Sequence, residues 1–450
     1  MFVKRTAELK LLEEQYTSQG SKLIILYGRK GLGKTTLLTQ FMDGKMAYYY
    51  TGVECVDKMQ LQRMNRQLGA FTVNPSPTDF STLFTSLIKE SEQKPVIILD
   101  EFHLIIKNSP DFLEALGVLS DLKHPVLIIL SSSSIKWVEN EMIPNMGAFA
   151  SYISTYRKLK EFTFVDFVNR FPKSSVESCI YINAILGGVP DYLNDWKEDR
   201  SVRENIKHIL LDKNSRLFLE PQQFLKQELR EPAVYNTILC ALAGGRRKLN
   251  DLHEHTGFSR AKISVYLKHL IQLDLVEKLV PVNEEGKENV QKGIYRIKDN
   301  FFSFWYRFIF TNLSELMLGR VSSVYDKWIE PYLEEYMGEY FADVCTEYLK
   351  LMNLHQRLSE KYLWWDRWYG KNGTIDVLAQ GSSQKMLVGK CLWEDRKMDT
   401  GDYEKLLSLS EEAGLRTAHS YLFSKGGFTE ELRLIGKEKS FVILVGLEDL

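Results

Sequence analysis

Residues 23–36 read LIILYGRKGLGKTT, and this stretch constrains the fold more than any other part of the chain. The apolar run at 23–26 predicts a buried β-strand. The G-x-x-x-x-G-K-T pattern that follows contains Gly28, Gly31 and Gly33, which let the backbone turn and bring its N–H groups against phosphate oxygens. A helix beginning near Gly33 would direct its positive end at the same anion. The stretch therefore predicts a binding site for a nucleoside triphosphate.

The side chains that end this motif predict the cofactors. Lys34 is expected to reach the β- and γ-phosphates, and the hydroxyl of Thr35 to ligate Mg²⁺. Thr36, the next residue, is expected to contribute to the same nucleotide site. We therefore expect ATP and Mg²⁺ as cofactors, with ATP and ADP as the small-molecule partners.

A second apolar run, at 95–99, ends in the pair Asp100-Glu101. Asp100 is expected to hold Mg²⁺ through water, and Glu101 to polarise the attacking water, as in NTPases of the additional-strand type. Four apolar residues followed by two acids is a common pattern by itself. Its position after the phosphate loop, with a strand and helices between, makes it the expected partner of Lys34 and Thr35.

The first part of the chain predicts a parallel α/β sheet, because apolar strand patterns alternate with helical ones. Five strands are expected, at about 22–27, 46–51, 95–99, 126–130 and 162–164. Ser131 or Ser132, at the end of the fourth strand, is expected to sense the γ-phosphate; the alternative is a serine-rich loop that caps a helix. Arg157 is read either as a basic γ-phosphate sensor or as part of a solvated basic turn before the fifth strand.

Residues 165–222 are read as helical and contain the sequence Gly187-Gly188-Val189-Pro190. The glycines end one helix, and Pro190 fits the first turn of the next. This pattern by itself indicates a corner between two helices.

A winged helix–turn–helix pattern follows at about 235–297. Helices are expected at 235–243, 249–256 and 261–273, then two wing strands. The third helix is modestly basic, whereas the wing mixes lysines with glutamates, so two readings stay open: a DNA reader, or a structural or protein-interaction module. The residues concerned are Arg260, Lys262 and Lys268 on the helix, and Lys287, Lys292, Glu284, Glu285 and Glu288 on the wing.

Composition bounds the class of protein. With a net charge of −1, the protein as a whole has no positive electrostatic field that would attract polyanions. Binding of nucleic acid would therefore need a local basic surface. The five cysteines lack C-x-x-C spacing, which favours reduced thiols over a disulfide framework or a zinc site. No apolar run approaches the length of a membrane span. We expect a cytoplasmic protein with no membrane contact.

The order of these motifs resembles the DEXX-box, STAND-related P-loop ATPases, a mostly archaeal family with some bacterial members. The motifs that carry the likeness are GRKGLGKTT at 28–36, LDEFH at 99–103, GGVPDYL at 187–193, ELREPAVYNTIL at 228–239, YRIKDNFFSFWYRF at 295–308 and TIDVLA at 374–379. The resemblance implies that Pro190 packs on adenine. It also implies that the N-terminal box, the Phe-x-x-Arg-x-x-Glu-Leu pattern at 2–9 that contains Arg5 and Glu8, lies near the adenine base. It also implies a helical lid and a C-terminal domain of restriction-endonuclease-like (PD-(D/E)XK) fold.

The C-terminal domain departs from the nuclease pattern of such relatives. Asp376 stands in the expected Ile-Asp strand, but Phe341-Ala342 replaces a Phe-Glu pair, and Lys390-Cys391-Leu392 replaces Glu-x-Lys before Trp393. One carboxylate cannot hold a catalytic Mg²⁺ at a useful level. The sequence therefore predicts a nuclease fold without activity.

These readings combine into one expected architecture. An α/β P-loop ATPase domain is expected at 1–165, a helical lid at 166–225, a winged helix with a linker helix at 226–310, and the endonuclease-like domain at 311–450. The expected function is a slowly hydrolysing Mg-ATP-dependent switch with an unidentified protein partner. The alternatives are a DNA-binding or scaffold protein with structural nucleotide and, less favoured, an ATP-coupled nuclease.

Overall fold

The computed structural model describes residues 5–68, 77–89, 93–107, 109, 112–117, 124–279 and 293–450. The chain divides into two compact units. The first unit comprises residues 1–161 and the short segment Val189–Asp191, and the second comprises 162–188 and 192–450.

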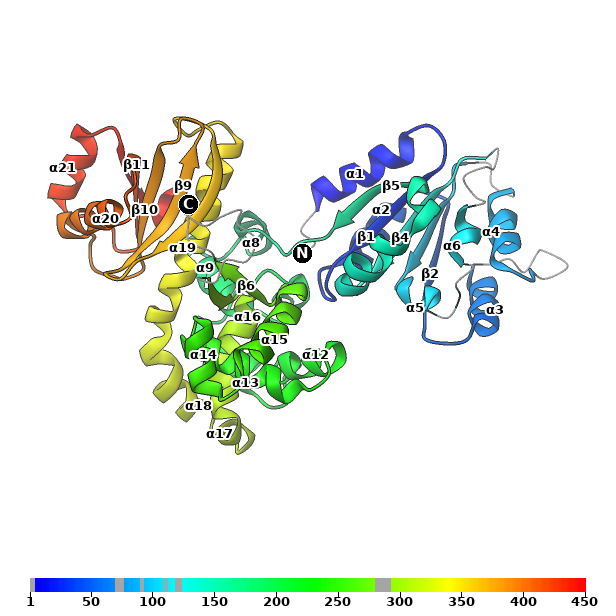
Figure 1. The fold of residues 1–450 in the computed structure, drawn as a ribbon, viewed down its shortest axis with the longest axis horizontal. Helices are drawn as coiled ribbons and strands as arrows, with labels where there is room; N and C mark the ends of the chain where they lie inside the picture. The colour runs from blue at the N-terminus through cyan, green and yellow to red at the C-terminus, as the bar shows by residue number, and fades with distance from the viewer. Residues whose placement is uncertain are drawn as a thin grey trace. The chain divides into compact units, whose positions relative to one another are not determined.

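The first unit is built on a five-stranded parallel sheet in the order β2-β3-β4-β1-β5 (Figure 1). Its strands are β1 (Lys22–Tyr27), β2 (Ala47–Thr51), β3 (Val96–Asp100), β4 (Leu127–Ser132) and β5 (Ile153–Lys158). The central strands are mostly apolar and almost entirely buried because helices cover both faces of the sheet. Strand β4 lies between β1 and β3, which is the additional-strand order that the sequence predicts.

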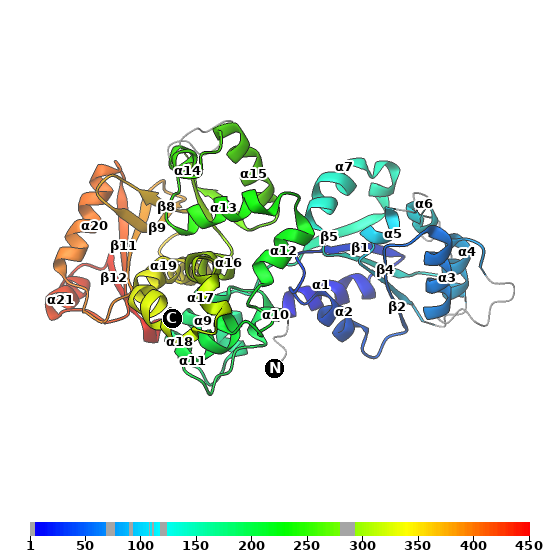
Figure 2. The same ribbon diagram turned by 90° about the horizontal axis from the view of Figure 1, so that it is seen from below.

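Helices lie on both sides of this sheet. Figure 2 shows α1 and α2 on one face and α5, α6 and α7 on the other. The helices are α1 (Thr6–Thr17), α2 (Lys34–Met42), α3 (Asp57–Gln67), α4 (Phe80–Lys89), α5 (His103–Ile106), α6 (Phe112–Gly117) and α7 (Ile143–Asn145). One core joins Ile25 of β1 and Leu99 of β3 to Phe84 of α4 and Phe112 of α6. This packing holds the carboxyl ends of β1, β3 and β4 at one edge.

The predicted position of the fifth strand, 162–164, is wrong. Strand β5 lies earlier, at Ile153–Lys158, and alternates half-buried and exposed residues because it is an edge strand beside β1. Residues 163 and 164 instead begin helix α8 (Phe164–Arg170), where Thr163 and Asp166 form a reciprocal cap. Polar residues alternate along this edge strand, and for that reason its sequence resembles a solvated turn.

The second unit begins with helices and continues into the winged helix. The helices before the wing are α8, α9 (Val176–Leu186), α10 (Pro190–Leu193), whose first two residues belong to the first unit, α11 (Val202–Ile206), α12 (Glu220–Glu228), α13 (Pro232–Ala243), α14 (Leu249–Thr256) and α15 (Arg260–Gln272). Antiparallel strands β6 (Val276–Leu279) and β7 (Ile294–Ile297) form the base of the wing. The winged-helix prediction is confirmed, while the wing residues Lys287, Lys292, Glu284, Glu285 and Glu288 lie outside the described part.

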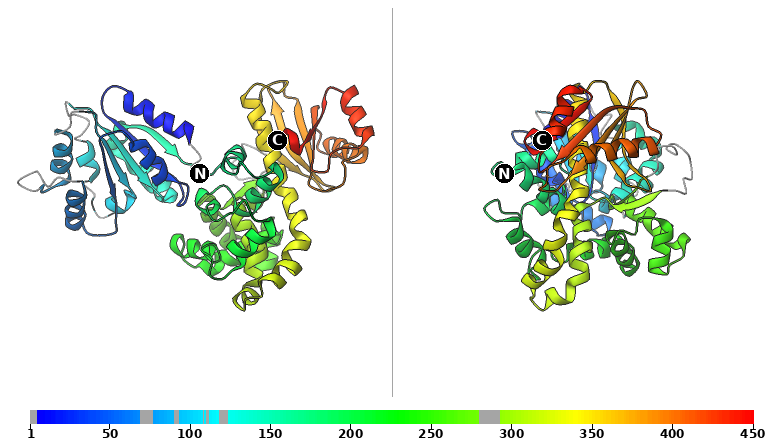
Figure 3. Two further views of the ribbon diagram at one scale, coloured as in Figure 1. Left: turned by 180° about the vertical axis from the view of Figure 1, so that it is seen from behind. Right: turned by 90° about the vertical axis from the view of Figure 1, so that its left-hand side faces the viewer.

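The C-terminal part of this unit is a mixed sheet in the order β12-β11-β10-β9-β8. Strands β8 to β10 are antiparallel neighbours, and β10 to β12 are parallel. Figure 3 shows α19 on one side of the sheet and α20 and α21 on the other. The remaining elements are α16 (Asn300–Phe304), α17 (Leu313–Met317), α18 (Val321–Val324), α19 (Glu330–Leu354), β8 (Tyr362–Tyr369), β9 (Thr374–Gly381), β10 (Met386–Leu392), α20 (Thr400–Glu412), β11 (Thr417–Ser424), α21 (Glu430–Glu438) and β12 (Val442–Gly446).

Candidate nucleotide site

The predicted phosphate loop lies between the end of β1 and the start of α2. Gly33 caps α2 with φ of 82°, a left-handed conformation that favours glycine. A Cβ added at Gly28 would lie 2.7 Å from the carbonyl oxygen of Leu159. The loop therefore requires glycine at Gly28 for space and at Gly33 for backbone conformation.

Lys34 is buried, and its ammonium group lies inside the loop. Its Nζ donates to the carbonyl oxygens of Gly28 at 2.6 Å and Arg29 at 3.2 Å. Burial lowers the pKa of Lys34, while the negative charges of Glu101 and Asp100 oppose that shift. A cation is thus held where phosphate oxygens are expected to enter.

The structure brings Thr35 and Asp100 together, as the sequence predicts for a shared magnesium ion. The Thr35 hydroxyl donates to Oδ2 of Asp100 at 3.1 Å. A hydroxyl and a carboxylate oxygen are ligands that suit Mg²⁺, directly or through water. Thr36 lies beside them on the first turn of α2 and is exposed.

Sequence reasoning missed Tyr49, which lies on the neighbouring strand β2. Its hydroxyl donates to the same Asp100 oxygen at 2.6 Å. Burial, together with this hydrogen bond, raises the pKa of Tyr49 to about 12, so the phenol stays a donor. The Glu101 backbone N–H donates to the other Asp100 oxygen at 3.0 Å. Both oxygens of the predicted metal ligand are thereby oriented.

Glu101 lies directly after β3 and reaches across to the end of β4. Its carboxylate accepts hydrogen bonds from the backbone N–H of Ser133 at 3.0 Å and from the Ser133 hydroxyl at 2.8 Å. Its backbone has φ of 50°, which is uncommon for a residue with a side chain. The predicted base is therefore held by Ser133, a residue the sequence reading did not single out.

Ser131 and Ser132 differ in what their hydroxyl groups do. The Ser132 hydroxyl lies 3.0 Å from Nδ1 of His103. The Ser131 hydroxyl is buried and makes no hydrogen bond with any described residue. Burial lowers the pKa of His103, although the charge of Glu101 opposes the shift, which favours a neutral imidazole here. Ser131 keeps an unused polar group at the strand end where the sensor is predicted.

Arg157 lies on β5 itself, and not before the fifth strand, the position predicted from the sequence. Its guanidinium pairs with Glu8 of α1 at 2.7 Å. Arg5, just before α1, donates to the carbonyl oxygen of Leu32 in the phosphate loop at 2.8 Å. The N-terminal box thus contacts both the loop and β5, and the proposed sensor role of Arg157 stays a prediction.

Pro190 lies in the short segment that belongs to the first unit. The backbone N–H of Asp191 donates to the Gly31 carbonyl oxygen at 3.2 Å. A Cβ on Gly31 would lie 3.0 Å from a methyl group of Val189. The segment around Pro190 therefore packs directly on the phosphate loop, and the packing of Pro190 on adenine stays a prediction.

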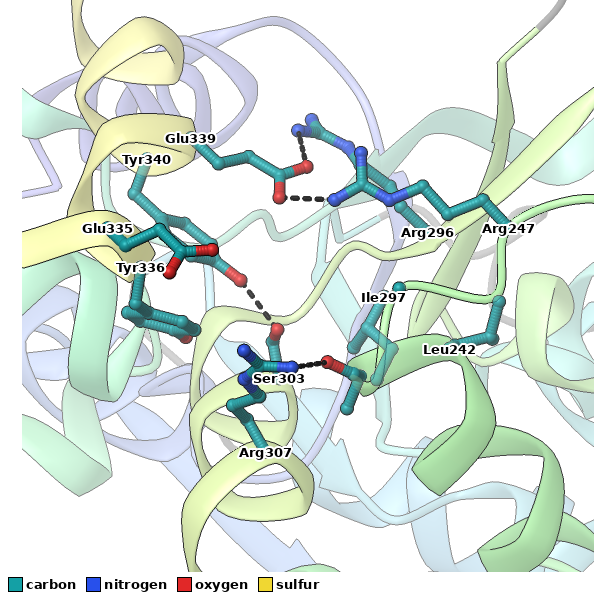
Figure 4. A pocket seen from close by; sticks show the side chains of 12 residues that line it. Leu242, Arg247, Arg296, Ile297, Ser303, Arg307, Glu335, Tyr336, Glu339 and Tyr340 are labelled. Atoms are coloured by element: carbon teal, nitrogen blue, oxygen red, sulfur yellow. Dashed lines mark hydrogen bonds and ion pairs between the residues drawn. The ribbon is translucent and has the colours of Figure 1, made fainter. Parts of the chain in front are cut away.

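A separate polar pocket of about 180 Å³ lies in the second unit (Figure 4). Glu339 of α19 pairs with Arg247, which precedes α14, at 2.5 Å and with Arg296 of β7 at 3.5 Å. Arg296 also pairs with Asp343 at 3.1 Å, and Arg367 of β8 reaches the same carboxylate at 2.9 Å. Burial alone would lower the pKa of Arg296, but these carboxylates raise it well above its ordinary value. The pocket and the ion pairs beside it form a charged cluster that connects the winged helix with α19, and Arg367 extends this cluster to β8.

Together, the parallel sheet, the phosphate loop and the Asp100-Glu101 pair define a P-loop ATPase of the additional-strand type. One family comparison agrees with this class, and two more match later parts of the chain. Residues 2–196 match the ATPase domain predominantly from Archaea, residues 236–278 match the bacterial regulatory proteins of the arsR family, and residues 305–405 match archaeal and bacterial proteins of unknown function. The matches follow the predicted order along the chain: a part similar to an ATPase domain, a part similar to a winged-helix-type domain, and a C-terminal part.

Individual proteins are similar to the chain over different lengths. An uncharacterized protein of Methanocaldococcus jannaschii is 29% identical over 100% of both chains. An uncharacterized ATP-binding protein of the same organism is 47% identical over 45 residues, which is 10% of this chain and 76% of that protein. The Walker-type ATPase of Pyrococcus abyssi has a similar structure, with a TM-score of 0.50 and 16% identity, covering 68% of this chain and 96% of that one. The last likeness concerns the fold alone.

None of the helices in the described ranges combines the length and apolar character of a membrane span. The predicted cytoplasmic location stays a prediction.

Proposed function

We propose that this chain binds Mg-ATP in the first unit and hydrolyses it slowly as a nucleotide-dependent switch. The observation that carries the proposal is the meeting of Thr35 with Asp100, with Glu101 next to them at the carboxyl ends of parallel strands. Mg²⁺ would be held by the Thr35 hydroxyl and, through water, by Asp100. It would neutralise the phosphate charge that develops in the transition state.

The chain's own residues supply the remaining chemistry. Lys34 binds the β- and γ-phosphates with a buried ammonium, and the N–H groups of the glycine loop bind their oxygens. Glu101 takes the proton of the attacking water once it leaves its two hydrogen bonds with Ser133. Ser131 offers its unused hydroxyl to the γ-phosphate, and Arg157 offers a cation.

The switch follows from the path of the chain around Gly31. Residues 189–191 contact the phosphate loop, and the residues on both sides of this segment belong to the second unit. A change in the loop between ATP and ADP would therefore act directly on the segment that leads into the winged-helix unit. A protein partner that binds only the ATP-bound or only the ADP-bound form would respond to this change.

Two substitutions test the site. Lys34→Ala should abolish nucleotide binding in a calorimetric titration, and Glu101→Gln should bind ATP but turn it over at least 100-fold more slowly. The matched controls are Lys10→Ala and Glu14→Gln, which change the same residue types on the exposed side of α1, where the two side chains are 76% and 62% exposed. Unchanged binding and turnover in both site variants would reject the proposal.

DNA binding by the winged helix is the second candidate function. Arg260 and Lys268 are exposed on α15, the helix that enters the major groove in many winged helices. Lys262, however, lies 4.9 Å from the ring centroid of Phe258, and Arg260 donates to Asn250, so both cations are partly engaged. Duplex binding should weaken steeply with salt, and Arg260→Ala and Lys262→Ala should each reduce that slope by about 1. Failure to bind duplex at low salt removes this candidate.

Nuclease activity is not part of the proposed function. Asp376 lacks the carboxylate partners that a catalytic Mg²⁺ needs, because Ala342 and Lys390 occupy their expected positions. Mg²⁺-dependent cleavage that is lost in Asp376→Ala would contradict this part of the proposal.

A further inference from the structure

The C-terminal domain contains a cleft of about 650 Å³ between α19 and the strands β9 and β10. Its lining includes Asp376, Lys390 and Ala342, the positions at which the nuclease resemblance places metal chemistry. A magnesium site needs near-octahedral oxygen ligands at about 2.0–2.1 Å. The residues of the cleft can be tested against that requirement.

Asp376 already accepts three hydrogen bonds from the protein, at least one on each carboxylate oxygen. Its Oδ1 accepts from the Thr374 hydroxyl at 3.0 Å. Its Oδ2 accepts from Lys390 Nζ at 2.9 Å and from the Cys391 N–H at 2.9 Å. No group of three or more His, Cys, Asp or Glu residues in the described ranges could hold a metal ion. The residues present therefore do not fit a divalent metal.

We infer that the Lys390 ammonium is a covalently attached replacement for the metal ion of this nuclease-like cleft. It is a cation held on Oδ2 of Asp376, and both residues line the cleft. Burial alone would lower the pKa of Lys390, but the charge of Asp376 and the hydrogen bond to it raise it, so the amine stays charged. A metal at bonding distance from that oxygen would collide with the ammonium in both space and charge.

Two arginines of the cleft are also paired with carboxylates. Arg396 is paired with Asp402 at 2.7 Å and with Glu394 at 2.7 Å, and Arg367 is paired with Asp343. The described lining carries about as many carboxylates as cations, so it offers little attraction to a phosphodiester. The cleft is a metal-independent part of the domain's structure.

A double-mutant cycle on the full-length chain tests the exchange of metal for lysine. Lys390→Met leaves the half-buried Asp376 carboxylate without its cation, and Asp376→Asn leaves the ammonium without its anion. Each single change should lower Tm by about 5 °C or more, while the double variant should recover most of that loss. Lys405→Met, an exposed cation of the same cleft, is the control. Single changes no larger than the control, or losses that simply add in the double variant, overturn the inference.

Metal titration supplies the second test. Nucleotide-free wild type should give no saturable Mn²⁺ binding that depends on Asp376, and a chelator should leave its Tm unchanged. Restoring the nuclease pattern with Ala342→Glu, Lys390→Glu and Leu392→Lys should create a Mn²⁺ site whose affinity is at least 10-fold higher than any Mn²⁺ binding by wild type. Adding Asp376→Ala to this variant should abolish the site.

Wild-type Mn²⁺ binding that Asp376→Ala removes would overturn the inference. A folded restored variant that binds no better than wild type would do the same. If the restored variant does not fold, the double-mutant cycle still tests whether the Lys390 ammonium is required by the Asp376 carboxylate.

Discussion

Glu347 offers a prediction whose size can be worked from the structure. It lies on α19, and its carboxyl group accepts a hydrogen bond from the Phe164 backbone N–H at 2.6 Å, at the start of α8. Burial raises the pKa of Glu347 from 4.5 to about 7; the Phe164 N–H opposes the shift, and the charge of Asp166 adds to it. The folded unit therefore holds a neutral carboxylic acid over a pH range in which the unfolded chain ionises.

The sign of the pH effect follows from proton binding. Below about pH 4.5 both states hold the proton, and above about pH 7 neither does. Between these values the folded state binds more protons, so stability falls as pH rises through this window. A shift of this size corresponds to about 3 kcal/mol at full extent.

Glu347→Gln should remove this penalty. The amide is neutral at every pH and keeps an oxygen that can accept from Phe164. The variant should match wild type near pH 4.5 and exceed it by about 3 kcal/mol at pH 8, which is roughly 5–10 °C in Tm.

Thermal melts of both proteins at half-unit pH steps would measure the difference, with Glu404→Gln, an exposed position on α20, as control. A difference that does not grow with pH, or a variant less stable than wild type at pH 8, would refute the reasoning.

Three further outcomes are expected. Tyr49→Phe removes one of the two hydroxyl donors to Asp100. Turnover should then need roughly 10–100-fold more Mg²⁺, while ATP binding without metal is unchanged. An unchanged dependence of turnover on Mg²⁺ would contradict the role of Tyr49 in orienting Asp100. Gly28→Ala would push a Cβ against the Leu159 carbonyl and should abolish nucleotide binding, which calorimetry would detect; full affinity would contradict the loop geometry. Arg296→Met leaves three carboxylates short of a buried cation and should cost about 3 kcal/mol in denaturant unfolding, whereas a loss under 1 kcal/mol would show that the charged cluster is not tightly coupled.

Local patterns predicted the parts of the fold and the site that depend on neighbouring residues. The phosphate loop, the acid pair after β3 and the three helices of the winged helix each carry a signal within a short window. The predicted pairing of Thr35 with Asp100 followed because parallel strands end at one edge of a sheet.

Features that depend on strand order or on an edge position escaped the sequence reading. Ser133 reaches Glu101 only because β4 lies beside β3, and Tyr49 reaches Asp100 only because β2 borders β3 on its other side. Strand β5 was missed because a strand with one neighbour keeps polar residues on its open side. One signal was present in the sequence: Thr163 three residues before Asp166 marks a helix start, which argues against a strand at 162–164.

The return of Val189–Asp191 to the first unit has a practical consequence for dissecting this protein. The chain passes from one unit to the other after residues 161, 188 and 191, so no single cut separates the first unit from every residue of the second. A fragment that stops at the end of β5 would leave the Gly31 carbonyl without its donor and the side of the loop at Val189 open to water. Expression of an isolated ATPase fragment should therefore extend beyond Asp191, and a shorter fragment that binds ATP poorly would say nothing about the intact site.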